Sequence, residues 1–181
     1  MGNIMPDELR AKIRDIPDFP KKGIVFRDIT TLLRDPWAFK HSVKAMADYY
    51  RDKGIDVIAA AESRGFIFGA AIAYELGIGF IPVRKPGKLP YETESTTYEL
   101  EYGTDTLEMH KDAVKPGQKV LLVDDLLATG GTIRATADLV RKLGGRIAGI
   151  CFLIELSFLK GRAKLDDLGV DVYSLIQYDS E

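Results

Sequence analysis

The chain has 181 residues, of which 46% are hydrophobic, and its 25 basic and 27 acidic side chains give a formal net charge of -2. A chain of this length can bury the core of one globular domain. The slightly negative charge argues against nucleic-acid binding, which usually requires an excess of Lys and Arg.

The few cysteine and histidine residues exclude several other classes of protein. A single cysteine, Cys151, allows no internal disulfide, so we expect a reducing, cytoplasmic environment. Only two histidines are present, and without a Cys/His cluster a structural zinc site is not expected. We also expect neither a secretory signal nor a membrane span, because no apolar run reaches about 18 residues.

The first segment combines a short helix with an extended aromatic stretch. Residues 6–14 are predicted to form an amphipathic helix that Pro17 and Pro20 terminate. The following segment, DFPKKGIVFRDIT, contains a short extended piece at 24–26. In it, Phe26 offers an aromatic face beside the hydrogen-bond donors of Arg27. A buried Phe26 and a surface Arg27 would fit the same pattern equally well.

The next elements alternate between helix and strand. Asp35 and Pro36 predict the start of a helix over 37–52, and the apolar run 55–61 predicts a strand. A polar turn, ESRGF, leads into a helix over 66–76. Arg64 in this turn is suited to binding phosphate or diphosphate by charge-assisted hydrogen bonds. An exposed arginine without a ligand would fit the same pattern equally well.

A third strand at 78–83 precedes a long polar region. Its basic beginning and many Gly and Pro residues predict a mobile loop over 84–97 that binds a polyanion and acts as a lid. Residues 98–110 are predicted to form a β-hairpin that turns at 103–105. Glu101 lies in this hairpin, where most glutamates are simply solvated.

The stretch VLLVDDLLATGGT, residues 120–132, carries the strongest chemical signal. It predicts a buried strand at 120–123, two carboxylates at Asp124 and Asp125, a glycine-rich loop, and then a helix to about residue 143. Such a loop at a helix N-terminus can hold a phosphate. The acidic pair is suited to sugar hydroxyls or a hydrated Mg²⁺. A plain turn with solvated aspartates is the alternative.

Two further strands are predicted at 146–156 and 170–178, the second near a sheet edge. The alternation of continuous apolar strands with helices predicts an α/β fold with a mostly parallel, doubly wound sheet. We expect a single domain with an N-terminal hood over residues 1–34, a core over 35–181, and a β-hairpin that carries the flexible lid loop.

Several of these segments resemble those of a known family. VDDLLATGGT is similar to the phosphoribosyl-diphosphate signature of the type I phosphoribosyltransferases. The detail of this signature resembles that of the adenine phosphoribosyltransferases. The resemblance extends over residues 6–178 and includes the segments FPKKGIVFRDIT, ESRGF, RKPGKLP, LEYGTDTLEM and LKGRAKL. The resemblance implies conversion of adenine and 5-phosphoribosyl 1-diphosphate to AMP and diphosphate in purine salvage.

The resemblance also implies a role for each site residue. Asp124 and Asp125 would bind the ribose hydroxyls and stabilise the sugar cation, and Glu101 would handle a proton on the purine. Tyr102 would belong to the lid, and the Glu62–Ser63 peptide bond would be cis. The expected 5′-phosphate loop is Ala128, Thr129, Gly130, Gly131 and Thr132; the expected diphosphate ligands are Arg64, Arg84, Lys85 and Lys88; the expected adenine contacts are Val25, Phe26, Arg27 and Leu126.

The same resemblance implies Mg²⁺ as cofactor, held mainly through substrate and water near the acidic pair, and a homodimer in which the loop at Arg84 reaches the neighbouring site. It implies small-molecule substrates and no nucleic-acid or membrane partner. Two alternatives stay open: a phosphoribosyltransferase for another purine or a pyrimidine, and a regulator of the same fold that senses the sugar diphosphate. The regulator would need a helix-turn-helix extension or a basic surface.

Overall fold

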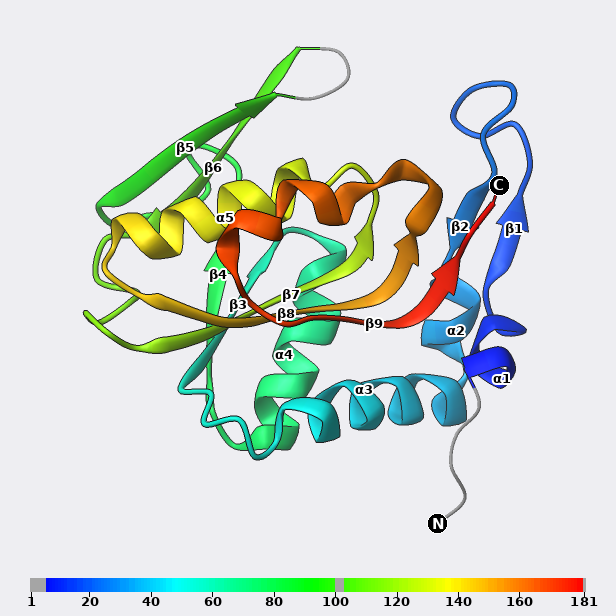
Figure 1. Cartoon of the computed structure of the whole chain (residues 1–181), viewed down its shortest axis with the longest axis horizontal. Coiled ribbons are helices and arrows are strands. Elements are labelled where there is room, and N and C mark those ends of the chain that lie inside the picture. Colours follow the sequence, from blue (N-terminus) through cyan, green and yellow to red (C-terminus); the bar gives the residue numbers. More distant parts are fainter. Residues whose placement is uncertain (1–5, 100–102, 181) are drawn as a thin grey trace.

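A computed structural model describes residues 6–99 and 103–180 of the chain. Five strands form one parallel sheet in the order β4-β3-β7-β8-β9, as Figure 1 shows. These strands are β3 (Val57–Ala61), β4 (Gly79–Val83), β7 (Lys119–Leu127), β8 (Arg146–Leu156) and β9 (Val172–Tyr178). The predicted parallel, doubly wound sheet is confirmed, and β9 lies at the sheet edge as expected.

Helices cover both faces of this sheet (Figure 1). On one face lie α3 (Pro36–Tyr50) and α4 (Arg64–Leu76), and on the other lies α5 (Gly131–Lys142). Alternate residues of β7 divide between the two hydrophobic cores: Leu121 and Val123 face α3 and α4, whereas Val120 and Leu122 face α5. The strand is therefore apolar throughout because it is buried on both sides.

Helix boundaries follow the local chemistry that the sequence indicated. The side chain of Asp35 accepts hydrogen bonds from the backbone of Trp37 and Ala38, which caps α3. Helix α4 ends at Gly77, whose φ of 69° is readily adopted by glycine. Two short helices flank the hood, α1 (Pro6–Arg10) and α2 (Thr30–Arg34). The prediction of helix over 11–14 was wrong, since Arg14 begins a strand.

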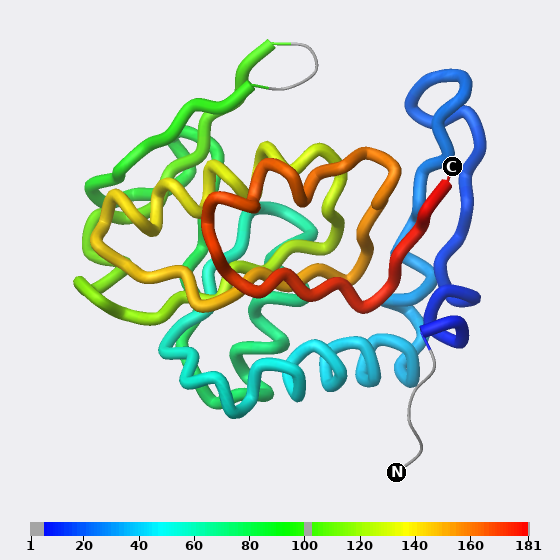
Figure 2. Tube along the Cα trace, viewed as in Figure 1, coloured from blue at the N-terminus to red at the C-terminus, as the bar shows by residue number. Residues whose placement is uncertain are grey.

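The hood contains a small antiparallel sheet of β1 (Arg14–Ile16) and β2 (Phe26–Asp28). In Figure 2 the C-terminal end of the chain runs beside it. Arg27 forms an ion pair of 2.6 Å with Asp15 and lies over the ring of Tyr178 at 4.2 Å. The contact of Arg27 with Tyr178, at the end of β9, therefore holds the hood against the sheet.

The predicted hairpin is present, but it begins earlier than expected. Strand β5 (Thr93–Glu99) pairs with β6 (Thr104–His110), and Glu99 lies opposite Thr104. The expected turn at 103–105 and the expected mobile loop over 93–97 were therefore wrong. The polar sequence of β5 lacks the apolar alternation by which a strand is predicted. The strand packs along α5, where Lys142 donates a 2.7 Å hydrogen bond to the Ser95 carbonyl.

Three 3₁₀ turns follow β8, namely η1 (Ser157–Leu159), η2 (Gly161–Lys164) and η3 (Asp166–Leu168). They replace the simple turn expected at 161–165. No helix among residues 6–99 and 103–180 is long and apolar enough to cross a membrane.

Tyr50 offers a test of how α3 is fastened to the sheet. Its hydroxyl is buried and donates a 2.8 Å hydrogen bond to the Ile150 carbonyl on β8. We expect Tyr50→Phe to lower the free energy of unfolding by about 1 kcal/mol, because that carbonyl loses a buried donor. Urea unfolding measures the change. Tyr91→Phe, at a side chain that is 62% exposed, is the control and should change it by less than about 0.5 kcal/mol. Equal effects of the two substitutions would contradict the assignment.

Candidate active site

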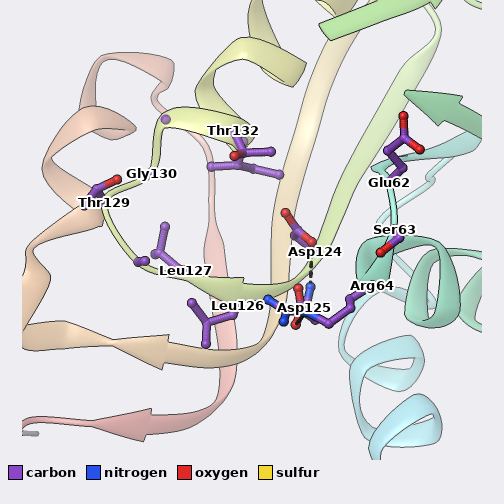
Figure 3. Close-up of a pocket in the computed structure, with 13 residues that line it drawn as sticks. Glu62, Ser63, Arg64, Asp124, Asp125, Leu126, Leu127, Thr129, Gly130 and Thr132 are labelled. Atoms are coloured by element: carbon purple, nitrogen blue, oxygen red, sulfur yellow. Dashed lines mark hydrogen bonds and ion pairs between the residues drawn. The ribbon is translucent and has the colours of Figure 1, made fainter. Parts of the chain in front are cut away.

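The carboxyl ends of β3 and β7, which are neighbours in the sheet, open into one pocket of about 410 Å³. Parallel sheets bind ligands at this edge. The loop after β3 and the loop after β7 form its walls (Figure 3). The lining residues are Glu62, Ser63, Arg64, Asp124, Asp125, Leu126, Leu127, Ala128, Thr129, Gly130, Gly131, Thr132 and Ile133.

The loop between β7 and α5 is shaped to hold an anion. Gly130 has a φ of 81° and precedes the first residue of α5. No side chain caps this helix end, and its first turn contains no acidic residue. Backbone N–H groups of the first turn are therefore free to bind a negatively charged ligand. The hydroxyl residues Thr129 and Thr132 also line the pocket.

The acidic pair lies within β7 itself, and the prediction that the strand ends at Val123 was wrong. Asp125 is 5% exposed and forms a 2.6 Å ion pair with the Nε of Arg64. The backbone N–H of Asp125 donates to Asp124 at 2.9 Å. Both carboxylates thus line the pocket at the end of one strand, and the charge of Arg64 neutralises that of Asp125.

Burial controls the protonation of both carboxylates. It raises the pKa of Asp124 well above its ordinary value, and the negative charge of Asp125 raises it further. Burial also raises the pKa of Asp125, although the charge of Arg64 opposes this shift. In the free protein the pair therefore carries less than two full negative charges over part of the acidic range. Hydroxyl groups of a sugar would supply the missing hydrogen bonds.

The expected diphosphate ligands divide into two groups. Arg64 is the first residue of α4 and lines the pocket, as predicted. Arg84, Lys85 and Lys88 do not line it. The carboxylate of Glu62 instead accepts hydrogen bonds from the Arg84 side chain at 3.0 Å and the Lys85 backbone at 2.6 Å. Their binding of diphosphate stays a prediction, whereas the predicted cis Glu62–Ser63 bond is confirmed.

The hood brings Phe26 to the pocket. The guanidinium of Arg64 lies 5.6 Å from the centre of the Phe26 ring. Val25 and Phe26 are half-buried, as is Leu126, which lines the pocket. The side chain of Arg27 is directed to Tyr178 instead, so only its main chain is suited to reading a base. Two further predicted residues, Glu101 and Tyr102, lie outside the described residues.

Sequence reasoning missed the residues that support the anion loop from behind. A side chain on Gly161 would overlap the carbonyl oxygen of Ala128, and a Cβ on Gly130 would lie 2.7 Å from the carbonyl oxygen of Gly161. On the other side, the Tyr98 hydroxyl lies 3.4 Å from that of Thr132. Two separate glycine turns are visible in the sequence, but their contact with each other is not.

The fold, the anion loop and the acidic pair together define a phosphoribosyltransferase. A family model described as "Phosphoribosyl transferase domain" matches residues 28–179, and the chain belongs to that family. A relative from Thermoanaerobacter sp. (strain X514), named adenine phosphoribosyltransferase, is 61% identical over 95% of this chain and 98% of its own. The chain groups with the adenine phosphoribosyltransferases.

Solved structures of adenine phosphoribosyltransferases are similar to this chain in fold as well as in sequence. The adenine phosphoribosyltransferase from Thermoanaerobacter pseudethanolicus matches with a TM-score of 0.92 and 60% identity over 96% of this chain and 100% of its own. The enzyme from Saccharomyces cerevisiae, solved with adenine and an imino-altritol bisphosphate, matches with a TM-score of 0.88 and 41% identity over 94% and 98% of the two chains.

The raised pKa of Asp124 gives a prediction about stability. A carboxyl group whose pKa is higher in the folded than in the unfolded state loses stabilisation as the pH rises between the two values. Asp124→Asn removes this cost, so we expect the free variant to unfold at a higher temperature than the parent at pH 7. The advantage should shrink as the pH falls toward the unfolded-state value of about 4.

Thermal unfolding of the free protein at several pH values measures this difference. The control is Asp112→Asn, an exposed aspartate on the connection after β6, which should leave the melting temperature unchanged. A variant at Asp124 that is less stable than the parent at pH 7 would show that the surrounding residues stabilise the carboxylate in the free protein.

Proposed function

We propose that the protein transfers a phosphoribosyl group from 5-phosphoribosyl 1-diphosphate to adenine, giving AMP and diphosphate in purine salvage. The observation that carries this proposal is one pocket in which an uncapped helix N-terminus faces a buried acidic pair joined to Arg64. An anion and a polyhydroxyl group are needed to satisfy both ends. The named activity of relatives about 60% identical supports the choice of adenine.

The sugar phosphate fits this pocket in one orientation. The 5′-phosphate is bound by the loop Ala128–Thr132, where N–H groups and the hydroxyls of Thr129 and Thr132 provide donors. The ribose hydroxyls then donate to Asp124 and Asp125. As the diphosphate leaves, C1′ gains positive charge, which these carboxylates stabilise. Arg64 leaves Asp125 for the leaving diphosphate, and the sugar hydroxyls replace it.

Adenine enters between the hood and the end of β7. Phe26 and Leu126 provide apolar faces for the ring, and the main chain at Val25 and Arg27 reads its edge. Glu101 assists the proton on the purine, and Tyr102 closes the lid with the basic residues Arg84, Lys85 and Lys88 beside the diphosphate. Orientation of the two reactants and exclusion of water supply much of the rate.

Mg²⁺ is the proposed cofactor. Among the described residues no group of three or more His, Cys, Asp or Glu side chains could hold a metal ion alone. The donors that remain are the two carboxylates at the end of β7, which suit a hard cation held mostly by substrate oxygens and water. When bound, Mg²⁺ would neutralise charge on the leaving diphosphate.

We also propose a cytoplasmic homodimer. The outer face of α4 exposes Ile67 and Tyr74, which are two turns apart and 37% and 89% exposed. Such a stripe is typical of a surface covered by a partner. Because α4 begins at Arg64, a second copy here would lie beside the pocket, where the loop at Arg84 can reach the neighbouring site. The buried thiol of Cys151 is compatible with a reducing compartment.

The base specificity is the sharpest test of the function. The purified protein with Mg²⁺, adenine and 5-phosphoribosyl 1-diphosphate should release AMP. Hypoxanthine and guanine should react at least about a hundredfold more slowly, because a site that pairs with the 6-amino group of adenine leaves buried polar groups unpaired when a 6-oxo purine binds. Chromatography of the products measures each rate. Preference for hypoxanthine would overturn the base assignment and leave the fold intact.

Two controls accompany this assay. Excess EDTA should abolish most of the turnover, and Mg²⁺ should restore it; undiminished turnover would exclude the proposed cofactor.

The double substitution Asp124→Asn with Asp125→Asn should remove most of the activity in a folded protein. Near-normal turnover in that variant would contradict the role of the acidic pair.

The dimer has a separate test in a matched pair of substitutions. Ile67→Glu places a charge on the α4 stripe and should convert a particle of about twice 20.1 kDa into a monomer of 20.1 kDa. Leu159→Glu changes a side chain that is equally exposed, at 38% against 37%, but lies on η1, and it should leave the dimer intact. Light scattering after size exclusion gives both masses. A monomeric parent protein would contradict the proposal.

A further inference from the structure

The back of the anion loop is held by another segment of the chain, the turn η2. Gly161, the first residue of η2, contacts the loop through its backbone, because neither Gly130 nor Gly161 leaves room for a side chain between the two segments. Such close packing fixes the loop conformation to the position of η2. Any displacement of η2 therefore moves the N–H groups that face the pocket.

Arg162, the next residue, fixes η2 to the sheet. Its guanidinium donates to both oxygens of Glu155, at 2.7 and 2.6 Å, and to the Val172 carbonyl at 2.8 Å. Glu155 is 4% exposed and lies near the end of β8, opposite Leu127 on β7 and Gln177 on β9. This fork therefore joins η2 to β8 and β9, and β8 is the neighbour of β7 in the sheet.

A second arginine holds η2 from the side of α5. Arg134, in the first turns of the helix whose N-terminus forms the anion loop, donates to the Lys164 carbonyl at 3.1 Å and also pairs with Asp167. Turn η2 is thus tied to α5 as well as to the sheet. The Glu155 carboxylate depends strongly on Arg162 because it is buried. Burial alone would raise the pKa of Glu155, but the hydrogen bonds from Arg162 keep that pKa below its ordinary value.

We propose that Glu155 and Arg162 are positioning residues for the 5′-phosphate, which they hold in place through Gly161 without touching the ligand. The inference rests on the proposed function, since it assigns the anion loop to the phosphate of the sugar. It predicts that damage to the pair weakens binding of the phosphate group selectively and spares the base and the ribose.

AMP and adenosine distinguish this role from a general structural one, because they differ only by the phosphate. In Arg162→Lys, which keeps the charge but not the two-pronged geometry, we expect AMP affinity to fall by about tenfold to a hundredfold and adenosine affinity to change by less than about twofold. In Glu155→Gln the same selective loss is expected. The Michaelis constant for the sugar diphosphate should rise while that for adenine stays constant. Calorimetry and initial rates measure these quantities.

Two further variants complete the experiment. Glu155→Met with Arg162→Met replaces the pair by apolar side chains, which commonly preserves folding, and should show the same selective loss even if a single substitution unfolds the protein. Lys44→Met breaks the 2.7 Å ion pair with Asp48 on α3, on the opposite face of the sheet from η2, and should leave the ratio of AMP to adenosine affinity unchanged.

The outcomes separate the inference from the proposed function. Equal loss of AMP and adenosine, or no loss, in folded variants would overturn the positioning role while the parent still discriminates the two ligands. A parent protein that binds AMP no more tightly than adenosine would overturn the assignment of the phosphate loop, and this inference with it.

Discussion

Two adjacent carboxylates at the end of a buried parallel strand are the feature on which the site depends. Placing charge at such a position is costly unless a partner neutralises it. Arg64 supplies that partner from the start of α4, at 2.6 Å from Asp125. The neighbouring residue must then be glycine, since a Cβ on Gly65 would lie 2.8 Å from a carboxylate oxygen of Asp124. The acidic pair thus explains why α4 begins with arginine followed by glycine.

The same constraint explains why the pocket is polar. Strand β7 places Asp124 and Asp125, and helix α4 places Arg64, so the charged groups come from two regular elements of the fold. A ligand that brings hydroxyl groups and a phosphate would offset the desolvation of the carboxylates with hydrogen bonds and would bind the uncapped N-terminus of α5. The acidic pair and the helix N-terminus are therefore complementary halves of one binding site.

Much of this arrangement could be predicted from the sequence because it is local. The apolar runs, the capping Asp35, Gly77 at the end of α4 and the acid–glycine stretch each specify their own conformation. Strand β5 could not be predicted, because its Thr and Glu residues gain stability from pairing with β6 and packing on α5. The contact of Gly161 with the anion loop joins segments about 30 residues apart, which no local pattern specifies.

The two ends of the substrate site are supported in different ways. In the proposed function, the sugar end rests on β3, β7 and α5, which belong to one continuous sheet and its covering helix. The proposed base end rests on Phe26 in a two-stranded sheet, which is anchored by Arg27 against Tyr178 at the end of β9. Transfer to a nitrogen of the base requires both ends to be aligned within a fraction of an ångström. The C-terminal strand therefore belongs to the catalytic architecture, because it fixes where the hood lies relative to the sheet and so where the base meets the sugar.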